Sequence, residues 1–262
     1  MTYSCAVFER DDATLEEAQE AKVDLVCRKL GLREGQRLLD VGCGWGTMAI
    51  HAASRYGVRV VGVTLSREQQ ELAQKRVAEA GVGDRVEIRY QDYRDVHDGP
   101  YDAVSSIGMF EHVGLARTAE YFGNLWSLLR DGGRLLNHAI SRRPSPRTRF
   151  ARGGFIERYV FPDGELLEVG QTVSAVQGAG FEVRHVETLR EHYARTLRHW
   201  VRNLEASWAD AVSLAGEARA RIWRLYMAGS AANFEAGRTQ VHQVLAVKAP
   251  GGDARVPLRP WW

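Results

Sequence analysis

The sequence predicts an α/β protein built on one doubly wound, mostly parallel sheet of seven strands, of the Rossmann-like kind. Short β-branched runs alternate with helical patterns over the first 140 residues, as in parallel sheets that are covered on both faces. A run of alternating glycines, residues 42–46, joins the first strand to a helix, where such sheets bind nucleotides. At 262 residues the chain is near the upper size for one hydrophobic core, which favours a single domain over residues 1–262.

The first 81 residues contain a helix and then two strand–helix pairs. Thr14 and Glu17 form a capping box that opens the first helix, and Ser66 and Gln69 are spaced for a second one. A glycine follows each helix, which is typical of helix ends. The elements expected here are helices at 15–30, 47–56 and 67–80 and strands at 37–42 and 58–64.

The remaining strands lie in two groups separated by a change of pattern near residue 150. Strands are expected at 86–90, 101–107 and 133–140, with a helix at 118–129, and further strands at 181–189 and 239–249. Residues 191–236 are rich in Trp, Leu and Ala and are expected to form two helices. We expect residues 1–140 to be the cofactor-binding core, 141–238 with the helical insertion to cover the substrate pocket, and 250–262 to be a flexible tail.

Composition and charge exclude several classes of protein. The chain is 45% hydrophobic and 26% charged, and no apolar run approaches the roughly 18 residues of a membrane span. A net charge of +2 does not indicate a nucleic-acid partner. Three cysteines without ligand spacing argue against a metal site, and the first residues show no secretory signal, so a cytoplasmic location is expected.

The glycine loop indicates the class of cofactor. Asp40, Gly42, Gly44 and Gly46 form the pattern DxGxGxG, in which one residue separates the second and third glycines, whereas an NAD fingerprint requires two. The pattern resembles that of class I S-adenosylmethionine (SAM) methyltransferases, with Asp40 as the acidic residue.

Nine segments over nearly the whole chain resemble the cyclopropane fatty acid synthase and mycolic acid cyclopropane synthase family, closest in character to actinobacterial members. Several exceed six residues and all occur in the family's order, which makes chance agreement very improbable. The segments are YSCAVF (3–8), LLDVGCGWG (38–46), GVTLS (62–66), QDYRD (91–95), SIGMFEHVG (106–114), HAI (138–140), FIERYVFPDGEL (155–166), HYARTLRHW (192–200) and YMAGSAANF (226–234).

The resemblance implies a reaction and two bound groups. Family members transfer the SAM methyl group to a cis double bond of an acyl chain, here that of an unsaturated phospholipid, and a bound bicarbonate then removes a proton to close the ring. The resemblance places the bicarbonate site on Cys5, Glu111, His138, Ile140 and Tyr193. It places SAM contacts on Tyr3, Ser4, Asp40, Gly42, Gly44, Thr64, Gln69, Asp92 and Tyr93.

The polar residues also have simpler interpretations. A lone histidine on a central strand, such as His138, is more often a core residue, but its coincidence with Glu111 and Tyr193 favours a site. Cys5 is expected to contribute its backbone and not a nucleophilic thiol. His112 should point away from Glu111 and is interpreted as structural.

Two departures from the family pattern limit what the resemblance implies, the first for the product and the second for SAM binding. GELLEVG (164–170) stands where cyclopropane synthases usually have G-x-LPS, so a methylene- or methyl-branched product is the alternative, and a small-molecule methyltransferase is a second one. Family chains usually carry a motif HYDxGNxFY before the segment that matches MTYSCA. Either the start of this sequence is misassigned or the segment is missing, and in the second case SAM is expected to bind more weakly than to a chain extended upstream.

The basic residues suggest where a lipid surface would be met. Residues 142–152 hold five arginines and no acid, and the C-terminal end adds Arg255, Arg259, Trp261 and Trp262. We expect peripheral contact with the inner face of the membrane through these segments, with a solvated loop and tail as the alternative. The sequence leaves the oligomeric state open.

Overall fold

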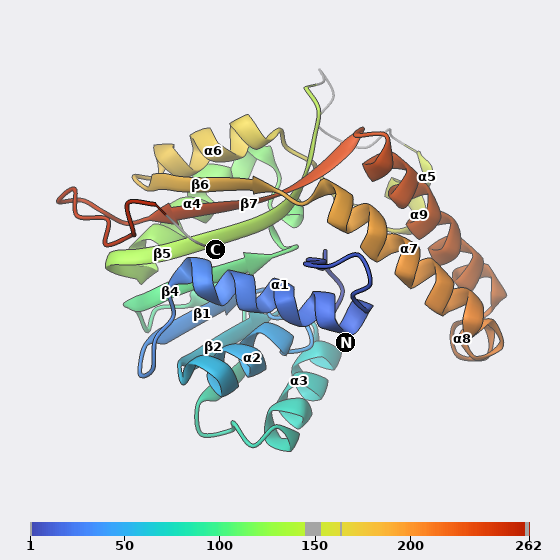
Figure 1. The fold of residues 1–262 in the computed structure, drawn as a ribbon, viewed down its shortest axis with the longest axis horizontal. Coiled ribbons are helices and arrows are strands. Elements are labelled where there is room, and N and C mark those ends of the chain that lie inside the picture. The colour runs from blue at the N-terminus through green and yellow to red at the C-terminus, as the bar shows by residue number, and fades with distance from the viewer. Residues whose placement is uncertain (1, 145–152, 163, 260–261) are drawn as a thin grey trace.

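The computed structural model describes residues 2–144, 153–162, 164–259 and 262, and its fold has a central seven-stranded sheet (Figure 1). The strand order is β3-β2-β1-β4-β5-β7-β6, and only β7 runs antiparallel to its neighbours. This confirms the predicted fold class. The strands are β1 (Arg37–Val41), β2 (Arg59–Thr64), β3 (Val86–Tyr90), β4 (Tyr101–Ile107), β5 (Leu129–Arg142), β6 (Glu182–Thr188) and β7 (Thr239–Val247).

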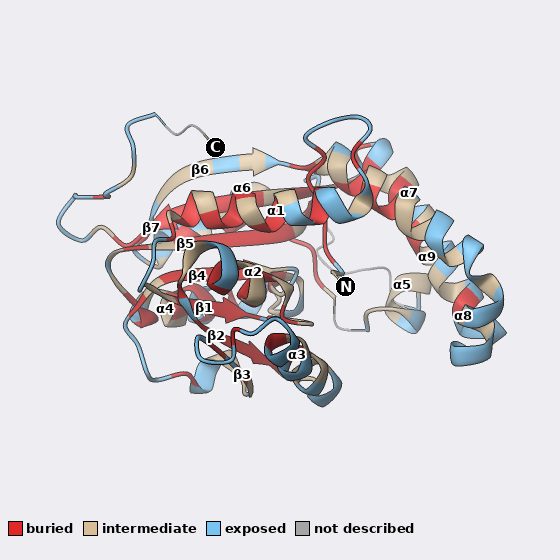
Figure 2. Cartoon of the chain, turned by 60° about the horizontal axis from the view of Figure 1, so that its bottom comes forward, coloured by how far each residue is buried: buried red, intermediate tan, exposed pale blue. Residues whose placement is uncertain are grey.

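Helices cover both faces of the sheet, so most residues of the inner strands β1, β2 and β4 are buried whichever face they are on. On one face α1, α2 and α3 pack over the central strands, and on the other α4 and α6 do so (Figures 1 and 2). Buried residues therefore concentrate in the strands and in the helix faces turned toward them (Figure 2). These helices are α1 (Leu15–Leu30), α2 (Thr47–Tyr56), α3 (Arg67–Glu79), α4 (Thr118–Leu128) and α6 (Val169–Gly178).

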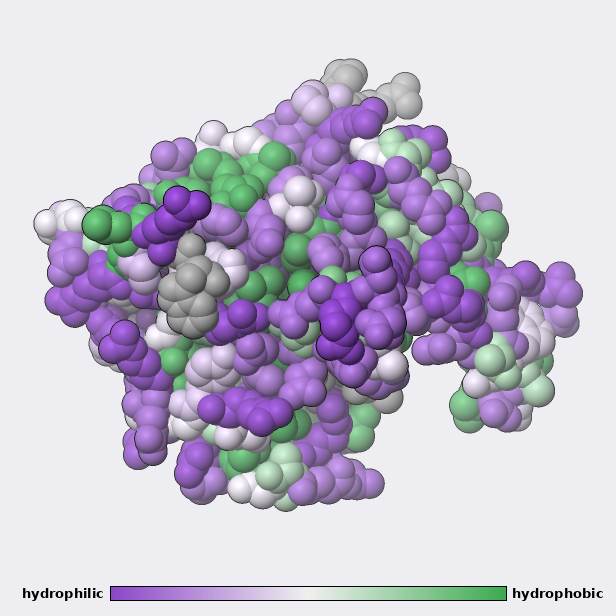
Figure 3. Space-filling model, viewed as in Figure 1, coloured by the Kyte–Doolittle hydropathy of each residue, from purple (hydrophilic) through white to green (hydrophobic). Residues whose placement is uncertain are grey.

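An arm of three helices, and not two, joins β6 to β7. It consists of α7 (Arg190–Ala206), α8 (Trp208–Ala215) and α9 (Glu217–Glu235), with α7 packed along α9 and α8 at the far end (Figure 1). Ser207 separates α7 from α8, and Gly216 separates α8 from α9. Gly216 has a positive φ of 80°, at which a helix cannot continue. None of the residues of α8 is buried, and hydrophobic residues reach the surface at this end of the arm (Figure 3).

Two local details differ from the expectations. β5 is longer than expected because its first residues pair with the start of β4 before a bulge. The second capping box is only half formed: the Ser66 hydroxyl accepts from the Gln69 backbone amide, but the Gln69 side chain bonds Thr64 instead.

The described chain also contains two α-helices not expected from the sequence, α5 (Phe155–Tyr159) and α6.

The N-terminal segment lies between α1 and the arm and is fixed by hydrogen bonds to both. The Ala6 amide donates to the Thr196 hydroxyl at 3.0 Å, and the Phe8 amide donates to His192 Nδ1 at 3.0 Å. From α1, the Gln19 side-chain amide donates to the Ser4 carbonyl at 2.9 Å. The segment therefore connects the sheet body to the arm, although it is nearly 190 residues from α7 in sequence.

The C-terminal residues return to the body of the protein. The Arg255 carbonyl accepts from the Arg134 guanidinium at 2.7 Å, and Ala254 is buried. The Trp262 ring meets His185 edge-on with centroids 6.0 Å apart, so it packs on the sheet and does not face outward as expected of a free tail. Among the helices in the described ranges, none is long and apolar enough to cross a bilayer.

Candidate functional site

A cavity of about 920 Å³ lies at the carboxyl ends of the parallel strands, where sheets of this kind bind ligands. Its wall is formed by the N-terminal segment, the loop after β1, the ends of β4 and β5 and the inner sides of α7 and α9, with further residues from α1, α3, α5 and the segment before α6. All five residues expected at the anion site line this cavity. Of the expected cofactor residues, Tyr3, Ser4, Asp40, Gly42, Gly44 and Gln69 also line it.

Gly42 and Gly44 of the glycine loop bring backbone without a side chain to the cavity. Gly42, Gly44 and Gly46 all have positive φ, and a Cβ at Gly42 would lie 3.0 Å from the Met109 side chain. At Gly44 a Cβ would meet no atom of the described chain within 4 Å, so this residue faces open space in the cavity. A ligand can therefore approach the backbone closely at the start of α2.

Asp40 is a buried carboxylate at the end of β1. It accepts a hydrogen bond from the Ser105 hydroxyl at 2.7 Å, and burial raises its pKa to about 6 against the lowering effects of that bond and of Lys22. Its second oxygen is buried and has no hydrogen-bond partner within the described ranges. This oxygen is available to a hydrogen-bond donor of a ligand.

Gln69 is held at the cavity by Thr64, the last residue of β2. The Thr64 hydroxyl donates to the Gln69 side-chain oxygen at 2.7 Å, which leaves the amide nitrogen of Gln69 as a donor. Thr64 itself does not line the cavity, so its contribution is to orient Gln69. Asp92 and Tyr93 do not line it either: Asp92 pairs with Arg94 at 2.7 Å, and the Tyr93 ring packs on Tyr121.

Glu111 lies in a short 3₁₀ turn (Phe110–His112) directly after β4. One carboxyl oxygen accepts from the Ile140 amide at 2.7 Å, which ties the turn to β5. The other oxygen is buried and has no hydrogen-bond partner among the residues described. Burial raises the pKa of this carboxyl to about 7, with the Ile140 bond as a smaller opposing effect.

His138 lies on β5 at the level where β4 ends. Its Nδ1 is 3.2 Å from the Gln243 side-chain nitrogen, and its Nε2 is buried with no partner in the described part of the chain. Burial, with the charges of Lys22 and Lys29, lowers the pKa of the ring to about 3. The imidazole is therefore neutral at any physiological pH.

Tyr193 and Cys5 complete the wall on the arm side. Burial raises the pKa of the Tyr193 phenol well above its usual value, so it is a neutral donor. The Cys5 thiol contacts the Ala6 and Leu189 carbonyls, and burial likewise raises its pKa, which excludes a reactive thiolate. His112, interpreted as structural, also lines the cavity, and its ring meets Phe161 edge-on.

Three aromatic residues next to Tyr3 and a buried lysine were not singled out from the sequence. The Tyr3 ring stacks on Trp200 at 5.1 Å and meets Trp223 at 5.8 Å, and with Tyr226 these rings form an apolar wall. Lys22 lies at the cavity, where its ammonium donates to the Ser4 hydroxyl at 3.0 Å and burial lowers its pKa to about 8. Its spacing four residues after Ala18 on the buried face of α1 is the sequence signal.

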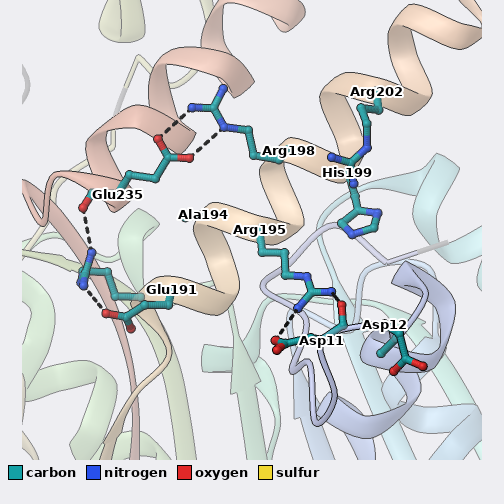
Figure 4. Close-up of a pocket in the computed structure, with 11 residues that line it drawn as sticks. Asp11, Asp12, Glu191, Ala194, Arg195, Arg198, His199, Arg202 and Glu235 are labelled. Atoms are coloured by element: carbon teal, nitrogen blue, oxygen red, sulfur yellow. Dashed lines mark hydrogen bonds and ion pairs between the residues drawn. The ribbon is translucent and has the colours of Figure 1, made fainter.

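A second hollow, of about 800 Å³, lies on the outer side of α7 (Figure 4). Its side chains are charged and largely paired with each other, as in Arg198 with Glu235 at 2.8 Å and Arg195 with Asp11 at 3.6 Å. It contains none of the expected site residues, and its charged lining does not suit an acyl chain.

In the described ranges, no group of three or more His, Cys, Asp or Glu side chains is placed to hold a metal ion.

Comparison with known proteins identifies the family. The chain is 53% identical over 263 residues to a probable fatty acid methyltransferase of Mycobacterium tuberculosis and 48% identical over 264 residues to one of Pseudomonas putida. Both alignments cover the whole chain, which spans 61% and 66% of the length of these relatives. The crystal structure of mycolic acid cyclopropane synthase CmaA1 complexed with SAH and CTAB has a TM-score of 0.88 at 38% identity, covering 94% of this chain and 90% of that one. The family model for mycolic acid cyclopropane synthetase matches residues 1–244, and the chain therefore belongs to this family.

Proposed function

We propose that this protein transfers the methyl group of SAM to the cis double bond of an unsaturated phospholipid acyl chain and closes a cyclopropane ring. Two buried atoms, Glu111 Oε2 and His138 Nε2, carry the proposal: neither has a hydrogen-bond partner among the described residues, and both residues line the same cavity as the glycine loop. This arrangement suits a small anion held next to an apolar substrate. The relatives named as fatty acid methyltransferases support the substrate class.

SAM fits the cofactor side of the cavity. Gly42 and Gly44 would accept close approach of the amino acid part, the free oxygen of Asp40 would accept from a donor group, and Gln69 would donate to the ribose. Tyr3 and Ser4, next to Lys22, would contact the cofactor from the N-terminal segment. The SAH in the related CmaA1 crystal structure supports this assignment.

Bicarbonate fits the other side. Bound SAM supplies the methyl group, and the bound anion accepts the proton that the substrate loses. Ionised Glu111 would accept from the hydroxyl of the anion, whereas neutral His138 and Tyr193 would donate to its oxygens. Cys5 and Ile140 line the same cavity.

The apolar wall has a chemical purpose in this reaction. Methylation of an alkene leaves a carbocation on the acyl chain, which water would trap as an alcohol. The rings of Trp200, Trp223 and Tyr226 keep water away and allow only the positioned anion to take the proton. CTAB, an alkyl-chain detergent in the related CmaA1 structure, supports a cavity that accepts such chains.

The segment GELLEVG gives a specific reason to consider a methylene- or methyl-branched product. The Glu165 amide donates to the Glu111 carbonyl at 3.1 Å, its carboxylate accepts from the Leu115 amide at 2.9 Å, and Leu166 lines the cavity. The departing residues themselves, Leu167 and Glu168, come directly after these contacts and lie against Arg142 at the end of β5. A hydride shift before proton loss would produce the methylene-branched chain from the same cation, and a methyl-branched chain would require a further two-electron reduction by a separate hydride donor.

Mass spectrometry of lipids from an expressing host, with derivatisation of double bonds, tests the proposal. A cyclopropane product adds one CH₂ to a monounsaturated chain and no longer reacts as an alkene, whereas a methylene product keeps a reactive double bond. A methyl-branched product has the mass of the saturated homologue. Turnover of a soluble acceptor with none on lipid vesicles would instead support a small-molecule methyltransferase.

A further inference from the structure

A row of polar side chains leads from the protein surface to His138. Glu187 on β6, Gln243 on β7 and His138 on β5 are direct neighbours in the strand register, so the three side chains lie on one face of the sheet. Lys29 reaches this row from α1, which covers that face. Lys29, Gln243 and His138 are at most 2% exposed, whereas the Glu187 side chain is 37% exposed.

The contacts in this row fix the direction of each hydrogen bond. The Lys29 ammonium contacts the Glu187 carboxylate and lies 2.7 Å from the Gln243 side chain. An ammonium only donates, so the atom of Gln243 that faces Lys29 must be its carbonyl oxygen. The amide nitrogen of Gln243 then faces His138 and can only donate to Nδ1, at 3.2 Å.

We propose that Lys29 and Gln243 are positioning residues that hold His138 as the tautomer with its proton on Nε2, so that this nitrogen donates to the anion in the cavity. The inference rests on the proposed function for the identity of the anion. Nε2 is the ring nitrogen that is buried without a partner among the residues described. An imidazole free to exchange tautomers would offer the anion a lone pair for part of the time, which would repel it.

The need to orient the Gln243 side chain explains why Lys29 is buried at this place. Lys29 loses hydration on burial, and the depressed pKa of its ammonium reflects this cost, which Glu187 partly offsets. A glutamine amide alone can turn over and present either its oxygen or its nitrogen to His138. The cation prevents this rotation, and its charge also helps to keep the ring neutral.

The test is to change the one group that donates to Nδ1. Gln243→Glu keeps the shape and the acceptor for Lys29 but replaces the donating nitrogen with an oxygen that accepts. His138 should then move its proton to Nδ1. ¹⁵N spectra of histidine-labelled protein distinguish the tautomers, and the His138→Gln variant identifies the His138 signals among the eight histidines. Lipid methylation should fall on the order of 10²-fold, as for loss of one positioned donor, with SAM affinity unchanged.

Matched variants make the result interpretable. Gln240→Glu adds the same charge on the same strand, outside the buried row, and should alter neither the His138 spectrum nor the rate. Lys29→Met frees the amide and should produce a mixture of the two tautomers. The wild-type spectrum is a test in itself, because a proton on Nδ1 there overturns the inference even where a variant does not fold.

The outcomes separate this inference from the proposed function. A Gln243→Glu spectrum that still has the proton on Nε2 overturns the positioning role, whatever the enzyme methylates. A switched tautomer with an undiminished methylation rate overturns the donor role of His138. If the protein methylates no lipid at all, the proposed function fails, while the spectra still decide how His138 is held.

Discussion

At the scale of single residues, Glu111 has the clearest consequence for pH dependence. Its carboxyl titrates near 4.5 in the unfolded chain and at about 7 in the folded protein, because burial disfavours the charge. The protonated form therefore favours folding below pH 4.5, and this contribution is lost as the pH rises through 7. The role proposed here requires the ionised form, so methylation should fall as the pH is lowered below 7.

Glu111→Gln should separate catalysis from stability. The amide oxygen of the variant can still accept from the Ile140 amide, and no charge is buried. We expect methylation to fall by a factor on the order of 10² to 10⁴ with SAM affinity nearly unchanged, as for loss of a residue that orients a base. At pH 8 the wild-type protein must bury the ionised carboxylate, which lowers its free energy of unfolding by at most on the order of 3 kcal/mol. The variant avoids this cost and should therefore melt at or above the wild-type temperature.

Rate assays, calorimetry with SAM and thermal melts at pH 5 and pH 8 measure these effects. Glu120→Gln, an exposed carboxylate on α4, is the matched control and should change none of them. A Glu111 variant that binds SAM and methylates lipid at the wild-type rate would rule out the role in orienting the base. Lower melting temperature and lower SAM affinity together would instead indicate a structural residue.

The site could be foreseen only in part. Glu111, His138 and Tyr193 follow from family segments that are far apart in sequence, and the fold brings them to one cavity. Lys22 and Lys29 were missed because a lysine on a helix is normally solvated. Their partners, Ser4 and Glu187, lie on other elements, so the periodicity of α1, which places Lys22 on the same face as Ala18, does not reveal what the two ammonium groups bind.

At the scale of elements, strands were predicted better than the helical insertion. Burial on both faces makes β1 and β2 largely apolar runs, which are visible in sequence, and β4 adds two buried serines to its apolar residues. The arm was expected to contain two helices because Trp, Leu and Ala suit a helix throughout residues 191–236. The break at Ser207 carries little sequence signal, and it depends on how α8 packs on α9.

The segment before α6 should influence which product forms. Changing Leu167 to Pro and Glu168 to Ser restores G-x-LPS next to the turn that carries Glu111, while Leu166 still lines the cavity. We expect the ratio of cyclopropane to branched product to rise, as measured by mass spectrometry of derivatised lipids. Glu168→Ser alone removes the ion pair with Arg142 at 3.5 Å and serves as the control. An unchanged product ratio in the double variant would contradict this role.

At the scale of the whole molecule, the structure divides the arginines expected at a lipid surface. Arg142 is a poor candidate: its side chain is 11% exposed, pairs with Glu168 and donates to the Leu166 carbonyl at 2.7 Å. Arg143 is exposed, whereas Arg147, Arg149 and Arg152 lie outside the described residues. Peripheral membrane contact remains a proposal that rests on the exposed members of this group.

Arg143→Ser should weaken binding to anionic vesicles about fivefold at low salt, since one basic residue near such a surface contributes about 1 kcal/mol. The effect should vanish at high salt and on neutral vesicles. Arg142→Ser should instead lower the melting temperature, because it removes a largely buried ion pair and a hydrogen bond. Vesicle sedimentation and thermal melts measure the two effects, and equal sedimentation of wild type and Arg143→Ser would count against the membrane contact.

Hydrogen exchange of two backbone amides in the N-terminal segment should report whether this segment is in contact with α7. Ala6 and Phe8 donate to side chains of α7, so both amides can exchange with solvent only when the segment and the arm separate. Any ligand that closes the cavity must slow both exchange rates together. Hydrogen exchange at these two residues thus reports separation of the arm from the N-terminal segment at the cavity, whereas the amides of β1 and β4 report global unfolding.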